Sequence, residues 1–203
     1  HTSMKYSKLS NKSFTATIKH LLLMAFAILT IGCGEKKSDG VNLDELEDRE
    51  GVAYLKNSDS PYTGKYFEFH DNGQKKVEAN YKDGKPHGIG FSWYENGQKK
   101  VEANLKDGKP DGLSVYWYEN GQKQAEINYK DGKPHGIGFN WYENGQKEAE
   151  GNHKDGKMDG LVVSWHENGQ KMMETNYKDN ELISGKFWNS KGEEVDSLEE
   201  ADQ

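Results

Sequence analysis

The sequence predicts an all-β protein, an elongated single-layer antiparallel meander of stacked β-hairpin repeats. Three landmarks that recur every 24 residues carry this prediction. The first Asn-Gly pair is at Asn72, the first Asp-Gly pair is at Asp83, and the first glycine of the connectors between hairpins is Gly64. A fixed period of this length is the signature of a repeat architecture, in which each unit packs only against its neighbours.

Each repeat holds two runs in which apolar and polar residues alternate, and this period of two predicts strands. In the second unit, residues 88–94 place Ile, Phe and Trp at alternate positions, and residues 100–105 do the same for Val, Ala and Leu. We expect the apolar residues of both strands on one face, and the Lys, Glu and Asn residues between them on a solvated face. About twelve strands follow from this pattern.

The Asn-Gly pair between the two runs predicts a type I′ hairpin turn, which needs positive φ at both central residues. Residues 52–63 resemble the second half of a repeat and are expected to form an entry strand. Residues 186–192 resemble a first half with one residue inserted upstream. The acidic residues that follow are expected either to fray or to fold back over the last strand through Val195 and Leu198.

Residues 1–32 have the layout of a secretory signal peptide. Four lysines and no acids precede or flank an apolar stretch at 21–31, and residues 1–3 are interpreted as non-native residues ahead of Met4. The apolar stretch is too short to span a bilayer but suits the apolar region of a signal peptide.

The segment Leu29-Thr30-Ile31-Gly32-Cys33 resembles the lipobox of bacterial lipoproteins. The resemblance implies cleavage before Cys33, acylation of Cys33 and a lipid-anchored protein of the bacterial cell envelope. Gly34, in place of an aspartate, favours the outer membrane. Because Cys33 is the only cysteine, it cannot form an internal disulfide. The alternative is a free thiol or a residue of a membrane helix.

The predicted organisation is therefore a signal peptide (1–32), a lipidated Cys33 with an acidic tether (33–50), a repeat domain (51–192) and an acidic C-terminal tail (193–203). The first half of the tether is expected to be flexible. Residues 42–50 are expected to form one or two helical turns, with Leu43 and Leu46 as their apolar contacts.

The charge of the chain excludes some functions. Its formal net charge is -7, and residues 33–203 alone hold 23 basic and 34 acidic residues. This balance argues against nucleic-acid binding, which needs a basic stripe. It also argues against binding of anionic lipid by the folded part, so the N-terminal lipid is the expected membrane contact.

The repeated pattern Trp-Tyr-Glu-Asn-Gly-Gln-Lys followed by Tyr-Lys-Asp-Gly-Lys-Pro-x-Gly resembles the variant MORN repeat, which occurs in tandem in bacterial proteins often labelled antitoxins of the YwqK type. The resemblance covers residues 52–192, with five clear units. It implies a ribbon of stacked hairpins that serves as an interaction module. A lipobox conflicts with antitoxin work against a cytoplasmic toxin.

Two aromatic columns are the candidate binding residues. The first is either the core of the sheet or a partly open aromatic stripe, and it comprises Trp93, Trp117, Trp141 and Trp165. The second is expected on the other face, with His166 in the same column, as a groove for a peptide or sugar or as residues that pair across strands. It comprises Tyr94, Tyr118 and Tyr142.

No catalytic, metal or cofactor site is predicted. Motifs for a nucleophilic serine, a phosphate-binding loop or a zinc site are absent from the sequence. His87 and His135 lie two units apart, about 19 Å along the ribbon. They cannot share a metal ion and are interpreted as surface turn residues.

The leading hypothesis is a non-catalytic, lipid-anchored scaffold that binds another protein at the cell envelope, through its aromatic face or an exposed strand edge. Pairing of two ribbons into a homodimer through their apolar faces stays open. The alternatives are an envelope glycan or cell-wall binding module and an antitoxin-like protein.

Overall fold

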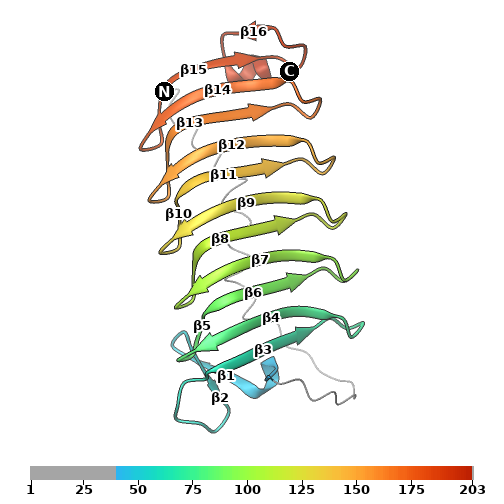
Figure 1. The fold of residues 1–203 in the computed structure, drawn as a ribbon, viewed down its shortest axis with the longest axis vertical. Helices are drawn as coiled ribbons and strands as arrows, with labels where there is room; N and C mark the ends of the chain where they lie inside the picture. The colour runs from blue at the N-terminus through green and yellow to red at the C-terminus, as the bar shows by residue number, and fades with distance from the viewer. Residues whose placement is uncertain (1–39, 203) are drawn as a thin grey trace.

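The computed structural model describes residues 40–202, which form one long, open, twisted ribbon of antiparallel strands (Figure 1). The predicted fold class is confirmed. Twelve strands follow one another along the ribbon, and two short strands, β5 (Lys85–Pro86) and β10 (Lys133–Pro134), pair beside it. The predicted signal peptide, Cys33 and the first part of the tether lie outside the described residues.

The twelve strands along the ribbon alternate between the first and second strand of each repeat. In chain order they are β3 (Gly64–Phe69), β4 (Lys75–Lys82), β6 (Gly88–Trp93), β7 (Lys99–Lys106), β8 (Lys109–Trp117), β9 (Lys123–Lys130), β11 (Gly136–Trp141), β12 (Lys147–Lys154), β13 (Lys157–Trp165), β14 (Lys171–Lys178), β15 (Glu181–Trp188) and β16 (Glu194–Val195).

The two apolar runs of each repeat lie on opposite faces, so the prediction of one apolar and one solvated face was wrong. Between β6 and β7, Phe91 lies opposite Glu102 and Ser92 lies opposite Val101, and residues directly opposite one another share a face. A β-bulge next to the hairpin turn causes this. Trp93 pairs with Lys99, the register then shifts, and the extra residue reverses which side chains share a face.

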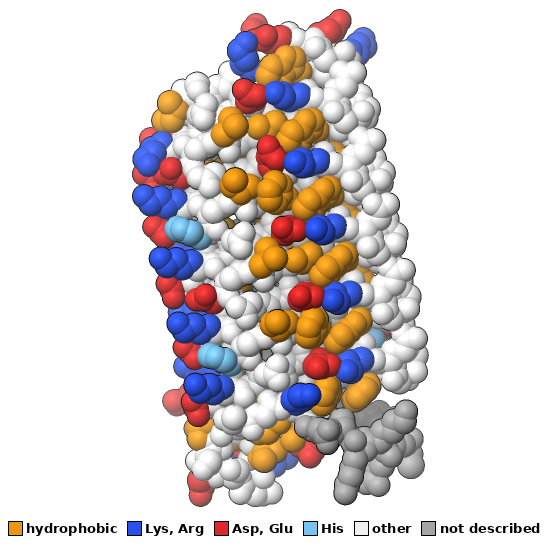
Figure 2. Space-filling model, viewed as in Figure 1, with side chains coloured by type: hydrophobic (Ala, Val, Ile, Leu, Met, Phe, Trp, Pro, Cys, Tyr) orange, Lys and Arg blue, Asp and Glu red, His pale blue; other side chains and the backbone are white. Residues whose placement is uncertain are grey.

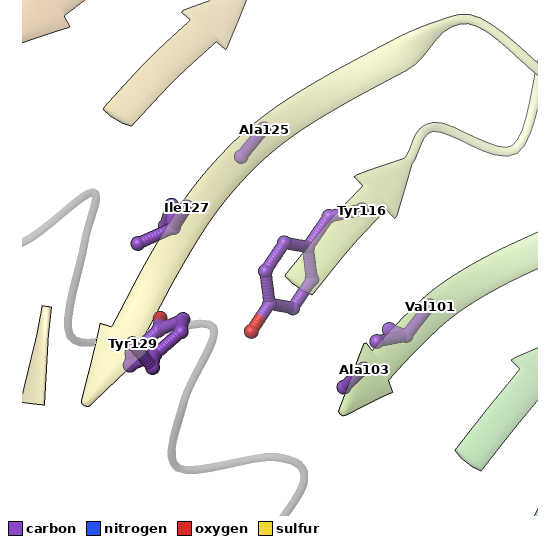
Figure 3. Packing of buried hydrophobic residues seen from close by; sticks show 6 residues of the cluster. All are labelled: Val101, Ala103, Tyr116, Ala125, Ile127 and Tyr129. Carbon is purple, nitrogen blue, oxygen red and sulfur yellow. The ribbon is translucent and has the colours of Figure 1, made fainter. Parts of the chain in front are cut away.

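The buried face carries the second-strand run. Its central cluster joins three neighbouring strands, β7, β8 and β9, and comprises Val101, Ala103, Tyr116, Ala125, Ile127 and Tyr129. In Figure 3 the ring of Tyr116 lies between the side chains of β7 and those of β9. The first strand contributes small polar residues to this face, among them Ser114, which is fully buried.

The two turns of each repeat differ from the prediction. At the Asn-Gly turn, the Gly97 amide donates to the Tyr94 carbonyl over 2.9 Å, so Glu95 and Asn96 are the central residues. Gly97 has positive φ (84°) and Asn96 does not, which is a turn followed by a left-handed glycine rather than type I′. The type I′ conformation occurs at the Asp-Gly turn, where Asp107 (51°) and Gly108 (81°) both have positive φ.

The N-terminal part of the described chain closes one end of the ribbon. A 3₁₀ turn, η1 (Leu43–Glu45), is followed by a separate hairpin of β1 (Leu46–Arg49) and β2 (Val52–Leu55). The helical prediction for 42–50 therefore holds for one turn only. The predicted entry strand pairs with β1 instead of joining the main sheet, because Leu46–Arg49 supplies a matching strand four residues long.

The C-terminal residues fold back over the last strands, which was the second of the two expected outcomes. β16 pairs with β15, and a short helix, α2 (Leu198–Ala201), packs against both and against β14. Its Ala201 is fully buried. Within residues 40–202, no helix has the length and apolarity needed to cross a membrane.

Candidate functional site

One face of the ribbon, which we call the open face, displays rows of apolar side chains (Figure 2). Each complete repeat from the second to the fifth contributes an aliphatic residue, a Phe or Val, and a Trp from its first strand. The aliphatic residues are 45–53% exposed, a high value for such side chains, and comprise Ile89, Leu113, Ile137 and Leu161. The open face results directly from the bulge, because the bulge separates these residues from the buried cluster.

Ion pairs separate the apolar rows. In every repeat the lysine after the Asn-Gly-Gln turn pairs with the glutamate three residues later, over 2.5–2.8 Å. The five pairs are Lys75–Glu78, Lys99–Glu102, Lys123–Glu126, Lys147–Glu150 and Lys171–Glu174. Exposed pairs of this kind contribute roughly 0–1 kcal/mol each. Their main effect is on the pattern of the surface, because they alternate with the apolar rows along the whole ribbon.

The same lysines also cover aromatic rings. The Lys99 Nζ lies 5.1 Å from the ring centre of Phe91 in its own repeat and 5.2 Å from that of Trp117 in the next. Equivalent contacts place Lys75, Lys123 and Lys147 over Trp93, Trp141 and Trp165 at 5.2–5.5 Å. Cation–π contacts at exposed sites contribute about 0.5–1 kcal/mol. Each lysine thus joins two repeats.

All four predicted tryptophans are half-buried on the open face. They therefore form a partly open stripe and take no part in the buried cluster on the other side of the sheet. The alternation within each first strand correctly predicts that the aliphatic residues share the face of the tryptophans, but it does not place the lysines there. The Lys-x-x-Glu spacing in every repeat could have indicated the ion pairs. Only the strand register shows that these side chains lie beside the tryptophans.

The tyrosine column joins neighbouring repeats. The hydroxyl of Tyr94 donates to the Trp117 carbonyl over 2.8 Å, and those of Tyr118 and Tyr142 donate to the Trp141 and Trp165 carbonyls over the same distance. At the two ends His70 and His166 replace the tyrosine, with ring nitrogens 2.9 Å from the Trp93 and Trp188 carbonyls. These hydrogen bonds explain why a tyrosine or histidine recurs at this position, so no ligand is needed to explain the column.

A small hollow lies beside this column. It measures about 260 Å³ and is lined by residues that include His70, Tyr94, Lys100 and Glu119. Lys100 lies over the Tyr94 ring, with its Nζ 5.1 Å from the ring centre. A space of this size and openness suits a side chain of a partner better than a whole ligand, for which pockets of roughly 300–1,000 Å³ are usual.

Alkaline pH is expected to destabilise the ribbon through these tyrosines. Burial, with Glu148 and Glu167 nearby, raises the pKa of Tyr142 to about 12, and burial also raises the pKa of Tyr94 and Tyr118. A raised folded-state pKa means that stability is complete below pH 10, the unfolded value, and is lost as the pH rises through the folded value. Spectrophotometric titration with thermal unfolding at pH 9 to 12 tests this. Tyrosines that titrate together near pH 10, with unchanged stability, would contradict it.

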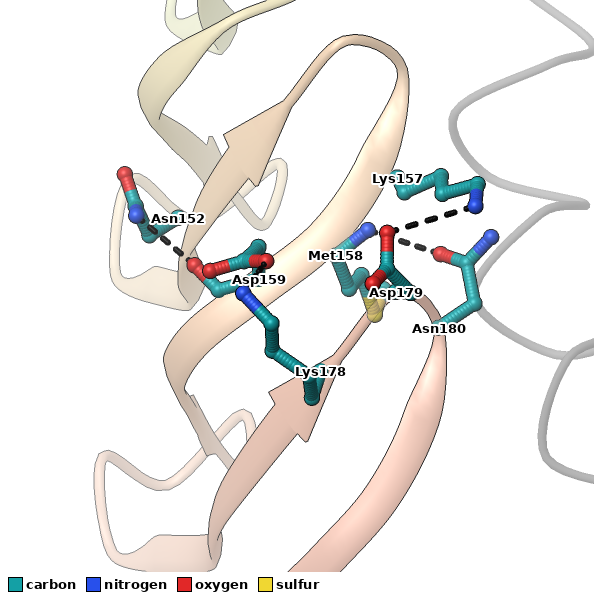
Figure 4. A network of polar contacts seen from close by, with 7 residues as sticks. All are labelled: Asn152, Lys157, Met158, Asp159, Lys178, Asp179 and Asn180. Carbon is teal, nitrogen blue, oxygen red and sulfur yellow. Dashed lines mark hydrogen bonds and ion pairs between the residues drawn. The ribbon is translucent and has the colours of Figure 1, made fainter.

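The turns at the other edge of the ribbon are held by contacts between repeats (Figure 4). Lys157 pairs with Asp179 over 3.2 Å, and Lys178 pairs with Asp159 over 2.7 Å. The hydrogen bond from Lys178 lowers the pKa of the Asp159 carboxyl. Lys157, Lys178 and Asp179 are exposed and Asp159 is partly buried. The two pairs align the turn at 155–156 with the turn at 179–180.

His87 and His135 lie at this edge, as expected for turn residues. Their Nδ1 atoms are 3.7 and 3.6 Å from the carboxylates of Asp107 and Asp155. Among residues 40–202, no three histidine, cysteine, aspartate or glutamate side chains come together in a way that could hold a metal ion.

Comparison with known proteins bears on the whole ribbon. The family model described as MORN repeat variant matches five consecutive segments, residues 62–83, 86–107, 110–131, 134–155 and 158–179. Each segment spans one Asn-Gly hairpin with its flanking strands. No curated protein matches this chain.

Proposed function

Because these five matches cover more than half of the chain, it belongs to the MORN repeat variant family, and we propose that it is a non-catalytic, lipid-anchored scaffold that binds another protein at the bacterial cell envelope, with the outer membrane favoured. The open face carries the binding part of the proposal. The lipobox-like segment ending at Cys33 carries the anchor and the location.

The open face has the composition of a protein-binding surface. Exposed aliphatic residues such as Ile89 and Ile137 lie beside half-buried tryptophans, and the Lys–Glu pairs border them. Contiguous apolar patches with polar borders mark interaction sites, and tryptophan is enriched among residues that dominate binding energy. The ring contacts of the lysines fix the side chains before a partner arrives, which lowers the entropy cost of binding.

The repeat spacing defines which partners fit. Equivalent residues in successive units are two strands apart, about 9.6 Å along the ribbon. A partner therefore meets the same apolar row several times, and each added row strengthens binding without a new kind of contact. An extended or repetitive protein surface matches this arrangement best.

The lysines favour a protein over a glycan as the ligand. A sugar that stacks on an indole needs a free ring face, and Lys99 lies 5.2 Å from the ring centre of Trp117. Equivalent lysines cover the other three tryptophans of the open face. A protein partner can use the exposed aliphatic residues without displacing these lysines.

The double substitution Leu113→Glu/Ile137→Glu is expected to abolish partner binding, with a loss of at least about 100-fold in affinity, since two charges would enter the apolar contact. Both side chains are about half exposed, so folding is expected to be unaffected. The measurement compares proteins co-purified with the wild-type chain and with the variant from detergent-solubilised envelope.

The matched control is Leu55→Glu, which adds a charge at an exposed leucine of β2, outside the main sheet. It is expected to keep the partner. A set of co-purified proteins that is the same for all three chains would place binding elsewhere and contradict the proposal.

A further inference from the structure

The last long strand, β15, leaves part of its outer edge unpaired. β14 pairs with β15 along one side from Glu181 to Phe187. On the other side, β16 pairs only with Phe187 and Trp188. Among the described residues, no strand pairs with the outer edge of residues 181–186, and all six are exposed.

This open edge exists because the sixth hairpin is incomplete. Complete second strands, such as β14, run for eight residues, whereas β16 has two, after which the chain turns into α2. Residues 181–186 therefore stay in the sheet without the neighbour that every earlier first strand has, and their pairing with β14 shifts register at Ile183. Unpaired backbone N–H and C=O groups on such an edge are a template for another strand.

The edge also exposes apolar side chains. Ile183 is 65% exposed, the highest value among the exposed large hydrophobic residues, and its neighbour Leu182 is 36% exposed. The opposite end of the ribbon has no comparable edge. There Val41 pairs with Tyr66 of β3 through two backbone bonds of 2.9 Å, to Lys65 and from Phe67.

We propose that two copies of the chain join through this edge, with the residues 181–186 of each copy paired antiparallel about a two-fold axis. The segment Glu-Leu-Ile-Ser-Gly-Lys is complementary to itself in that register. Glu181 lies opposite Lys186 of the second copy, Leu182 opposite Gly185, and Ile183 opposite Ser184. Acid meets base, and each large residue meets a small one, which are favourable cross-strand pairs.

The assembly closes at two copies. An isologous contact uses the same edge on both chains, and at the other end of each ribbon Val41 occupies the middle of the outer edge of β3. The result is one continuous sheet of double length, with both open faces available. Dimerisation through this edge does not depend on the proposed function, because it uses none of the open-face residues.

Charge reversal tests the pairing. Glu181→Lys and Lys186→Glu each place like charges opposite one another at two symmetric positions, so each is expected to weaken the dimer at least about tenfold. Lys186→Glu also removes the ion pair of Lys186 with Glu194 of its own chain, over 3.4 Å, which Glu181→Lys leaves intact. The double variant Glu181→Lys/Lys186→Glu restores opposite charges and is expected to restore the dimer. Sedimentation equilibrium of the full chain under reducing conditions, over a concentration series in one detergent, measures the dissociation constant.

Lys191→Glu is the matched control, because it makes the same change of charge in the turn beyond the edge, between β15 and β16. It is expected to leave the dissociation constant unchanged. A wild-type chain that stays monomeric at every concentration overturns the proposal. A dimer that the single charge reversals do not weaken, or that the double variant does not restore, also overturns it.

Discussion

Replacing Tyr116 by alanine is expected to destabilise the folded ribbon by about 3–5 kcal/mol, as for other large buried aromatic residues. The side chain is 4% exposed and packs among residues of three adjacent strands (Figure 3). Each repeat contacts only its neighbours, so damage in the centre separates the ribbon into two halves. Thermal and urea unfolding of the full chain, followed by circular dichroism, measures the loss.

The matched control is Val115→Ala, one residue earlier on the same strand. Val115 lies on the open face opposite Glu126, and it is only half-buried. Its truncation is expected to cost about 1 kcal/mol or less. The sequence pattern predicts the opposite order of burial, with Val115 on the apolar face and Tyr116 on the solvated face. A greater loss from Val115→Ala than from Tyr116→Ala would therefore contradict the assignment of the two faces.

Replacing Cys33 by serine is expected to abolish lipid attachment completely, because the thiol that would carry the acyl group is then absent. Each acyl methylene buried in a membrane contributes about 0.8 kcal/mol, so several chains hold a protein tightly. For the wild-type chain, we expect the intact mass from the native membrane fraction to match residues 33–203 plus acyl chains. The serine variant is expected to incorporate no labelled fatty acid.

Ser38→Ala, in the predicted tether, is the control and is expected to be acylated like the wild type. A wild-type chain with an uncleaved, unacylated mass would remove the anchor from the proposed function. It would also restore an antitoxin acting in the cytoplasm as the leading alternative. The binding and dimerisation experiments do not depend on this outcome, because they address residues in the folded ribbon.

Much of the fold follows from local signals in the sequence. The 24-residue period, the alternation of two and the Gly-containing turns predict stacked antiparallel hairpins, because turn conformation and strand preference are properties of a few adjacent residues. The incomplete last unit shows where such signals fail. In the sequence, Gly185 looks like the glycine between hairpins, displaced by one inserted residue. In the structure, Gly185 pairs with Thr175. Thr175 is the equivalent of Gly151 in the repeat before, and Gly151 pairs with Val162, so Gly185 takes the place of Val162.

The sequence predicted some residues of the candidate site but not the complete surface that they form. Trp93 and its equivalents were identified from their recurrence, and alternation placed the aliphatic residues on the same face, but the lysines beside them were not predicted. Alternation within one strand shows only which residues of that strand lie on the same face of the sheet. How the faces of two strands correspond depends on the bulge at Ser92 and Trp93, where a single extra residue reverses the correspondence.

The sequence by itself therefore determined the repeat, the all-β ribbon and the membership of the residue columns. The tertiary structure decided which columns share a face, that Tyr94 and its equivalents bond one repeat to the next, and that β15 keeps part of its outer edge open beside the short β16. These features arise from pairing between residues about 10 to 25 positions apart. Such pairing is set by register, and local propensity does not encode register.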